Sequence, residues 1–276
     1  MTQGTSLLCV DAGNTLVKWC VHDSGQKNFS DIAVLSNYPT AELKPFDEAD
    51  AVLRALFSPL LSEGNSPIAA VLLCNVLGSD FEQAMLRLCE QHRIPLHVLS
   101  VNSTVPMRSA YESPFQLGKD RWAACLAVSQ TSQSPVNLLV SFGTATTVDA
   151  VVNRSGWKHL GGFIVPGLHT MLDSLHVNTA ELPQVELGKP LLSTESGFWP
   201  VNTQQAIEQG VGRLQAALIQ SSADQLEQQY KQAPVVWFSG GYAPQMLSYF
   251  PQARLLENVV FKGLLFDYQC AGRVGS

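Results

Sequence analysis

The chain has 276 residues, of which 46% are hydrophobic and 14% are charged, and its formal net charge at pH 7 is −6. This composition excludes a disordered protein and is sufficient for one or two domains with large cores. The negative charge and the lack of a dense Lys/Arg run in the sequence argue against a nucleic-acid partner, because phosphate binding needs concentrated positive charge.

The sequence indicates neither a membrane span nor a signal peptide. No window approaches about 18 uninterrupted apolar residues, and the first ten residues, MTQGTSLLCV, lack a basic region and a cleavable apolar core. We therefore expect a cytoplasmic protein with no membrane partner. The six cysteines are scattered without a CxxC pair and are expected to be reduced. His169 and His176 share one helical face, but no third ligand accompanies them, so we expect no metal site there.

The first half of the chain alternates predicted strands and helices. An apolar strand at residues 6 to 10, a turn of Asp, Ala, Gly and Asn at 11 to 14 and a return strand at 15 to 21 predict a β-hairpin. A helix at 51 to 61, a buried strand at 69 to 74, an amphipathic helix at 80 to 92 and a strand at 96 to 101 follow. This pattern is typical of an α/β domain.

The second half begins in the same way. A helix at 120 to 130 and a strand at 136 to 140 lead into SFGTATT at 141 to 147, and strands at 148 to 152 and 160 to 165 follow. LLCVDAGNTLVKW at 7 to 19 and LLVSFGTATTVDA at 138 to 150 form a weak internal repeat, with Gly13 and Gly143 at matching positions. Two related domains that face each other are one explanation of this repeat.

The rest of the chain is predicted to be mainly helical. Helices are expected at 168 to 175, 203 to 219 and 223 to 232, then a buried strand at 235 to 238, the turn SGGYA at 239 to 243 and a closing helix from about Asn258.

Three small loops at strand ends carry residues suited to a nucleotide. In DAGNT at 11 to 15, Gly13 lets the backbone approach an anion, Asp11 is a candidate ligand for a divalent ion or its water, and Lys18 lies close enough to balance phosphate charge. GTATT at 143 to 147 and SGG at 239 to 241 are the other two. Together they fit a nucleotide in a cleft, although three purely structural turns are the alternative, and none is a P-loop.

The stretch YESPFQLGKDRWAA at 111 to 124 is the most informative. Gly118 and Lys119 lead into Asp120 and Arg121 where a helix is predicted to begin. A helix start attracts anions through its free N–H groups, and the arginine fork suits a carboxylate. The alternative is that Asp120 is only an N-cap and Arg121 only a surface residue.

These motifs resemble, in order and spacing over nearly the whole chain, those of the type III pantothenate kinases, which are also described as Bvg accessory factor-like proteins of the actin-like ATPase superfamily. They are DAGNTLVKW, PFQLGKDRWAA, GTATTVD, GGFIVPG, NTQQAI at 202 to 207 and FSGGYA. The resemblance implies an α/β fold of two ribonuclease H-like domains, at residues 1–117 and 118–276, with a nucleotide cleft between them. It also implies a homodimer whose substrate pocket lies near the subunit boundary.

The same resemblance implies an activity and its residues. The enzyme transfers the ATP γ-phosphoryl group to the 4′-hydroxyl of pantothenate, and Asp120 is the proton acceptor. The residues implied to bind ATP are Asp11, Ala12, Gly13, Asn14, Thr15, Leu16, Val17, Lys18 and Thr144. Those implied to bind pantothenate are Tyr111, Gly118, Lys119, Asp120, Arg121 and Thr203. We expect Arg121 to clamp the pantothenate carboxylate and Mg²⁺ near Asp11 to bridge phosphate oxygens, which suits a reaction that needs positioning and neutralised charge.

One position departs from the family pattern. Ser141 stands three residues before Thr144, where the family carries an Asp that binds an activating monovalent cation, K⁺ or NH₄⁺. A neutral hydroxyl holds K⁺ more weakly than a carboxylate does, so we expect either K⁺-independent catalysis or a weakened enzyme. Asp149 is a candidate replacement, although a residue that satisfies local backbone groups is the better interpretation.

Two other functions stay open at this point. One is a regulatory nucleotide-binding protein without turnover, which the Bvg accessory label and Ser141 suggest. The other is a kinase or phosphatase of the same superfamily that acts on a sugar or acyl phosphate. The retained residues Asp11, Asp120, Arg121, Thr144 and Thr203 argue against the regulatory protein, because a protein without turnover has little need of all five. The GKDR segment at 118 to 121 argues against the other kinase or phosphatase, by resemblance alone.

Overall fold

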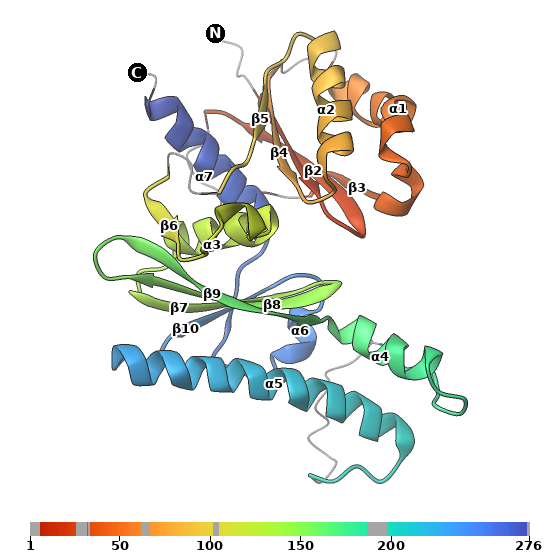
Figure 1. Cartoon of the computed structure of the whole chain (residues 1–276), viewed down its shortest axis with the longest axis vertical. Coiled ribbons are helices and arrows are strands. Elements are labelled where there is room, and N and C mark those ends of the chain that lie inside the picture. The colour runs from red at the N-terminus through yellow and green to blue at the C-terminus, as the bar shows by residue number, and fades with distance from the viewer. Residues whose placement is uncertain are drawn as a thin grey trace. The chain divides into compact units, whose positions relative to one another are not determined.

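The computed structural model describes residues 6–25, 32, 34–61, 67–101, 105–186 and 198–274. They form a mixed α/β chain with a five-stranded and a six-stranded sheet (Figure 1). The chain divides into two compact units: unit 1 comprises Met1–Met107, Tyr111–Ala127 and Asn258–Ser276, and unit 2 comprises Arg108–Ala110 and Val128–Glu257. These units are discontinuous, whereas the ranges expected from the sequence, 1–117 and 118–276, are continuous.

The sheet of unit 1 has the strand order β3-β2-β1-β4-β5. Its strands are β1 (Ser6–Ala12), β2 (Leu16–Asp23), β3 (Ser36–Pro39), β4 (Ile68–Asn75) and β5 (Leu96–Val98). The central strand β1 runs antiparallel to β2 and parallel to β4. β1 and β4 are almost continuously apolar because helices cover both faces of the sheet at this point.

Different helices cover the two faces of this sheet. Helices α1 (Asp50–Leu61) and α2 (Ser79–Gln91) pack on one face and close a core around Leu8, Val10 and Phe57. Helix α7 (Val259–Val274) packs on β1 and β4 and contacts the start of α3 (Lys119–Thr131). That contact needs Gly263, because a Cβ there would collide with the carbonyl group of Ala123. Three short 3₁₀ turns connect these elements: η1 (Thr40–Leu43), η2 (Phe46–Glu48) and η3 (Pro114–Gln116).

The sheet of unit 2 has the strand order β11-β10-β7-β8-β9-β6. Its strands are β6 (Met107–Ser109), β7 (Val136–Phe142), β8 (Ala145–Asn153), β9 (Trp157–Pro166), β10 (Val235–Ser239) and β11 (Arg254–Leu255). Helices α4 (Leu168–Val177), α5 (Thr203–Tyr230) and α6 (Ala243–Met246) contribute to its core, where Phe142 and Phe238 make an edge-to-face contact.

The two sheets share one topology. In each, the first strand of the unit's hairpin, β1 or β7, pairs antiparallel with the next strand and parallel with a later one, β4 or β10. The turns after β1 and β7 are also alike: the amide of Gly13 donates to the Leu16 carbonyl at 3.2 Å, and the amide of Gly143 donates to the Ala145 carbonyl at 3.1 Å. The internal repeat read from the sequence is therefore present in the fold.

Two expectations about local structure are wrong. The helices expected at 203 to 219 and 223 to 232 are a single helix, α5. The helix continues through the polar residues between them because Ile219 and Leu226, on either side, remain in the core; within this stretch Ser222 donates its hydroxyl to the Leu218 carbonyl at 2.7 Å. Asp11 and Ala12, expected in a turn, belong to β1, where they pair with Lys18 and Val17.

None of the helices in the described ranges combines the length and the apolar character that crossing a bilayer requires.

Candidate active site

Asp11 lies at the end of β1, directly opposite Lys18 on β2 and beside Cys74 on β4. Because side chains alternate along a strand, these three lie on the sheet face opposite the core that contains Val10 and Ala12. Burial raises the pKa of the Asp11 carboxyl to about 7; the charge of Lys18 opposes this rise and the charge of Asp120 adds to it. Near neutral pH this carboxyl is therefore only partly ionised.

The turn after β1 is held from behind by Thr40, a fully buried residue of η1. Its hydroxyl donates to the Gly13 carbonyl at 2.7 Å, and its amide donates to the Thr15 carbonyl at 3.0 Å. These bonds leave Asn14 and Thr15 exposed at the tip of the turn. Thr40 was not predicted as a site residue, because its role depends on a contact between residues 27 positions apart.

The predicted ATP residues of this segment, Asp11 to Lys18, do not all face the same way. The side chains of Ala12 and Val17 are part of the core of unit 1. Any contact of these two residues with a nucleotide must therefore come from their backbone.

The start of α3 brings together most of the predicted pantothenate residues. Asp120 accepts a hydrogen bond from the amide of Arg121 at 2.8 Å, and the amide of Trp122 donates to the Gly118 carbonyl at 3.0 Å. A Cβ on Gly118 would lie 2.6 Å from the Asp120 carboxylate oxygen Oδ1, so this position favours glycine. Asp120 is the second residue of α3 and bonds the amide of its direct neighbour, so the interpretation of it as the N-cap is wrong; its charge adds to the effect of burial on the Asp11 pKa.

Arg121 is buried, with 6% of its surface exposed, so the interpretation of it as a surface residue is wrong. Its Nη1 atom donates to the hydroxyl of Tyr111 at 2.9 Å, and its guanidinium carbon lies 5.8 Å from the centre of the same ring. The structure therefore joins two residues that the sequence placed in one pocket. Their arrangement fixes the plane of the guanidinium group.

The Cys74 thiol shows that β1, β4 and α3 meet at one place. Burial raises the pKa of this thiol well above its usual value, the charges of Asp11 and Asp120 raise it further, and the charge of Lys119 lowers it. All three charged groups therefore act on one thiol at the end of β4. Two carboxylates and two lysines, Lys18 and Lys119, converge there, which suits a reaction that moves a proton beside concentrated negative charge.

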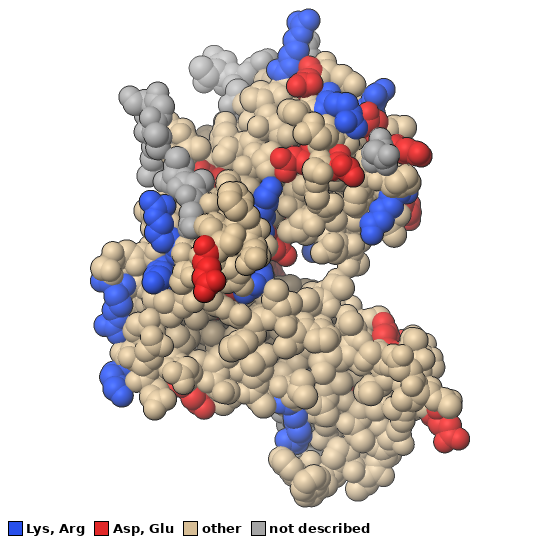
Figure 2. Space-filling model, viewed as in Figure 1, with Lys and Arg blue, Asp and Glu red and all other residues tan. Residues whose placement is uncertain are grey.

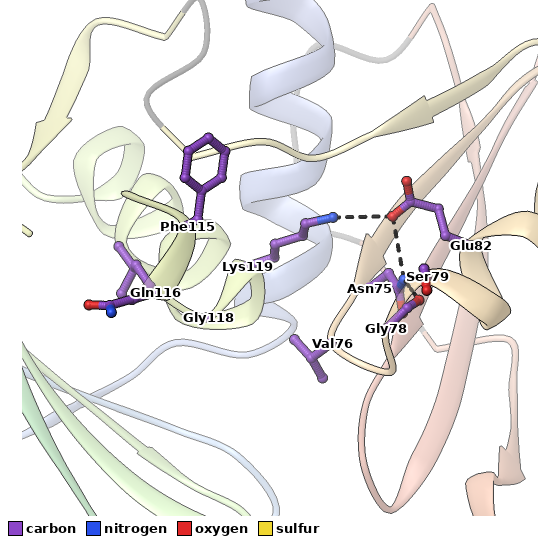
Figure 3. A pocket seen from close by; sticks show the side chains of 10 residues that line it. Asn75, Val76, Gly78, Ser79, Glu82, Phe115, Gln116, Gly118 and Lys119 are labelled. Atoms are coloured by element: carbon purple, nitrogen blue, oxygen red, sulfur yellow. Dashed lines mark hydrogen bonds and ion pairs between the residues drawn. The ribbon is translucent and has the colours of Figure 1, made fainter. Parts of the chain in front are cut away.

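A pocket of about 470 Å³ adjoins this site in unit 1 (Figure 3). It is lined by the end of β4, the first turn of α2 and residues 115 to 119. Lys119 lines the pocket, but its ammonium group lies 3.3 Å from the Glu82 carboxylate. Glu82 and Asn75, both unnoticed in the sequence, thereby become part of the surroundings of Asp120.

The remaining predicted residues lie in unit 2. Ser141 pairs with Thr147 on one side and Ser239 on the other. Thr144 is exposed, and its carbonyl accepts from the Gly167 amide at 3.0 Å. Thr203 is the exposed first residue of α5, next to the N-cap Asn202, whose side chain accepts from the Gln205 amide at 2.9 Å.

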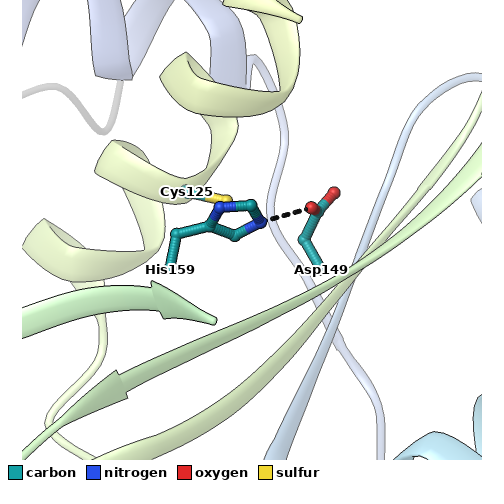
Figure 4. A group of neighbouring side chains, drawn as sticks. All are labelled: Cys125, Asp149 and His159. Carbon is teal, nitrogen blue, oxygen red and sulfur yellow. Dashed lines mark hydrogen bonds and ion pairs between the residues drawn. The ribbon is translucent and has the colours of Figure 1, made fainter. Parts of the chain in front are cut away.

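Asp149, the candidate replacement for the missing carboxylate, lies on the same sheet face as Ser141 but is buried. Its carboxylate is hydrogen bonded to Nε2 of His159 at 2.8 Å (Figure 4). The other ring nitrogen of His159 is hydrogen bonded to the hydroxyl of Ser109 at 3.1 Å. The Asp149 carboxylate is therefore bound to His159 in a buried side-chain pair. Neither interpretation of Asp149 from the sequence predicted this pair.

Comparison with known proteins decides the family. Residues 7–225 match the sequence profile of the family described as type III pantothenate kinase. The chain belongs to the type III pantothenate kinase family. Two curated type III pantothenate kinases illustrate the likeness. The one from Janthinobacterium sp. (strain Marseille) is 31% identical over 268 residues, which cover 94% of this chain and 95% of the relative. The one from Dechloromonas aromatica (strain RCB) is 33% identical over 267 residues, which cover 94% and 97%.

Solved structures show the same fold at low identity. A Baf family protein from Campylobacter jejuni superposes with a TM-score of 0.60 at 19% identity, covering 96% of this chain and 99% of that one. The ROK hexokinase from Thermus thermophilus gives a TM-score of 0.50 at 15% identity, covering 98% and 100%. The expected actin-like fold is therefore confirmed. As a member of this family, the protein is a kinase, and the regulatory alternative is not favoured.

Proposed function

We propose that this protein transfers the γ-phosphoryl group of ATP to the 4′-hydroxyl of pantothenate, the first step of coenzyme A biosynthesis. In a chain of this family, one observation carries the proposal: Asp11, Lys18 and Asp120 converge where β1, β4 and α3 meet. Phosphoryl transfer needs little covalent help from the protein. It needs the reactants in line, neutralised phosphate charge and a carboxylate that orients the attacking hydroxyl.

On this proposal Asp120 accepts the proton of the pantothenate hydroxyl as the new P–O bond forms and the bond to ADP breaks. Its place in the first turn of a helix, bonded to the amide of Arg121, holds the carboxylate in one orientation. Arg121 binds the pantothenate carboxylate, because its guanidinium group is already oriented by Tyr111. Gly118 lets Asp120 take this position, and Thr203 is proposed as a further pantothenate contact.

ATP is proposed to bind at the turn after β1, with backbone groups of Gly13 to Thr15 on its phosphates, Lys18 beside them and Thr144 as a second contact. Asp11 fits a divalent cation, because it is a carboxyl whose pKa is raised first by burial and further by the charge of a second carboxyl, Asp120, and a bound cation would favour its ionised form. Asp11 would hold Mg²⁺ directly or through water. When bound, this ion would supply charge neutralisation at the transferred phosphoryl group.

The residues around Ser141 do not fit the monovalent cation site of the family. Its strand neighbours Thr147 and Ser239 also carry neutral hydroxyls, and the Asp149 carboxylate is used by His159. We therefore propose catalysis that does not depend on K⁺ or NH₄⁺. Rates measured in K⁺, NH₄⁺ and a large organic cation should agree within about twofold. Strong activation by K⁺ alone would contradict this proposal.

We propose that the kinase acts as a homodimer that uses an apolar surface of unit 2. Phe163 and Ile164 on β9 are 55% and 62% exposed, and Trp199 and Val201, just before α5, are 79% and 93% exposed. Large apolar side chains that stay exposed in this way are candidates for a protein–protein interface. The face of unit 2 drawn in Figure 2 carries few charged side chains. Thr203 lies two residues after Val201, as expected for a substrate pocket near a subunit boundary.

A cytoplasmic location also stays part of the proposal. The six cysteines are buried and none of them forms a disulfide, as in a reducing compartment.

The decisive experiment is an ATP-dependent phosphorylation assay with pantothenate and a panel of sugars and acyl acids. The wild type should phosphorylate pantothenate, and Asp120→Asn should lower kcat by about 10² to 10⁴-fold while ATP still binds. Asp80→Asn is the matched control, because Asp80 is the second residue of α2 as Asp120 is of α3, but it is exposed. It should leave kcat unchanged.

The alternatives give different results in the same assay. Turnover of a sugar or acyl acid in place of pantothenate would indicate another kinase of the superfamily. ATP binding without turnover of any acceptor would indicate a regulatory protein.

A further inference from the structure

The first turn of α3 is tied to α2 by one ion pair across a pocket. Lys119, the residue directly before Asp120, extends over the pocket and places its Nζ atom 3.3 Å from Oε2 of Glu82 (Figure 3). Both side chains are about one-third exposed, at 32% and 36%. The space of about 470 Å³ beside them means that close packing does not fix α3 on this side. Among the described residues, the ion pair between Lys119 and Glu82 is a contact that spans this gap.

Glu82 is itself held by the end of β4. Asn75, the last residue of that strand, is buried; its side-chain oxygen accepts from the amide of Leu77 at 2.9 Å, and its side-chain nitrogen donates to the carbonyl of Gly78 at 2.8 Å. The same nitrogen lies 3.5 Å from Oε2 of Glu82. This connection between β4 and α2 adjoins the strand end at which Cys74 pairs with Asp11. A chain of contacts thus links the two sides of the catalytic site: the strand that lies beside Asp11 and the helix that carries Asp120.

We propose that Glu82 is a positioning residue for the reaction: acting through Lys119, it holds the first turn of α3 in place and so fixes the Asp120 carboxylate relative to Asp11. This inference rests on the proposed pantothenate kinase activity and deepens it. Lys119 belongs to the predicted pantothenate segment, yet its ammonium group is engaged by Glu82. Its main contribution is then to the geometry of its neighbour.

Positioning and simple stabilisation predict different kinetics. A partly exposed ion pair contributes little to folding, so its loss changes the stability of the protein little under either view. A small displacement of a proton acceptor, in contrast, weakens the transition state far more than it weakens substrate binding. Loss of the pair should therefore lower kcat and leave the KM for ATP nearly unchanged.

The test is a double-mutant cycle with Glu82→Gln and Lys119→Met, assayed with ATP and pantothenate. Each single variant should lower kcat about 3- to 10-fold, and the double variant should be no worse than either single, because both remove the same tie. Lys119→Arg, which keeps charge and reach, should retain more than half of kcat. The KM for ATP should stay within about twofold throughout.

The matched control is the ion pair between Asp50 of α1 and Arg87 of α2, which has an N···O distance of 2.7 Å and lies in the same unit. Asp50→Asn and Arg87→Met should leave kcat unchanged. Wild-type kcat in Glu82→Gln, or losses that multiply in the double variant, would overturn the positioning role and leave the proposed function standing. A wild type that does not phosphorylate pantothenate would overturn both.

Discussion

Replacing Asp11 by Asn tests the electrostatics of the site without any substrate. Burial and the neighbouring charge of Asp120 raise the pKa of the Asp11 carboxyl from 3.8 to about 7 in the folded protein. A carboxyl whose pKa is raised on folding binds protons more tightly in the native state than in the unfolded chain. The free energy of unfolding therefore falls as pH rises from about 4 to 7, and Asp11→Asn removes this dependence.

The magnitude follows from linkage between proton binding and folding. One pKa unit corresponds to about 1.4 kcal/mol, so the raised pKa of Asp11 lowers the free energy of unfolding by about 2 kcal/mol at pH 5.5 and by about 4 kcal/mol at pH 8. The variant should therefore gain stability relative to the wild type. That gain should grow by about 2 kcal/mol between the two pH values, whatever constant difference the amide introduces.

The assay is urea unfolding of both proteins at pH 5.5 and pH 8 in the presence of EDTA, so that no divalent cation binds. Asp50→Asn is the control, because Arg87 lowers the pKa of Asp50 and this exposed carboxyl is ionised in both states across the interval. Its stability difference from the wild type should not change between the two pH values. A constant difference for Asp11→Asn, or one that shrinks as pH rises, would refute the proposed burial and crowding of this carboxyl.

Three further changes test the loops and the surface of unit 2. Thr40→Val removes the hydroxyl that holds the turn after β1. It should raise the KM for ATP several-fold and lower the free energy of unfolding in urea by about 1 to 2 kcal/mol. An unchanged KM would show that this turn does not bind ATP. Gly167→Ala should raise the KM for ATP and lower the free energy of unfolding by about 1 to 3 kcal/mol, because its Cβ would collide with the backbone of Thr144 beside the turn after β7. The control is Gly210→Ala on α5, where a Cβ meets open space, and it should not destabilise the protein. Trp199→Asp should shift the protein from dimer to monomer in light scattering after size exclusion, and a dimer of unchanged affinity would move the interface elsewhere.

The local features of the fold were predictable because short sequence patterns determine them. The hairpin at β1 and β2 follows from alternating residues around a small turn, and the buried strand β4 follows from an apolar run. The repeat of the hairpin predicted two related sheets, and their strand orders agree. The start of α3 was also predictable, because Gly118 and Asp120 are typical of a helix N-terminus.

The residues that the sequence did not reveal all act through distant contacts. Thr40 lies 27 positions from the carbonyl that it holds, and Glu82 lies 37 positions from Lys119. Nothing in their local sequence distinguishes them from ordinary loop or helix-surface residues. Asn75 had a weak signal, since a polar residue that ends a buried strand shortly before a helix is a candidate for capping backbone groups.

The duplicated fold shows how two matching turns, one in each unit, come to differ in charge. Gly13 and Gly143 occupy matching turns, so Asp11 on β1 and Ser141 on β7 occupy matching positions two residues earlier. In unit 1 the matching position carries a carboxyl that faces Lys18, whereas in unit 2 it carries a hydroxyl between two other hydroxyl residues. A shared backbone therefore supplies two similar phosphate-sized turns, and side-chain changes decide which one handles charge. Because the ionisable groups lie at the end of β1, we expect Ser141→Asp to add a cation site to unit 2 without replacing the role of Asp11.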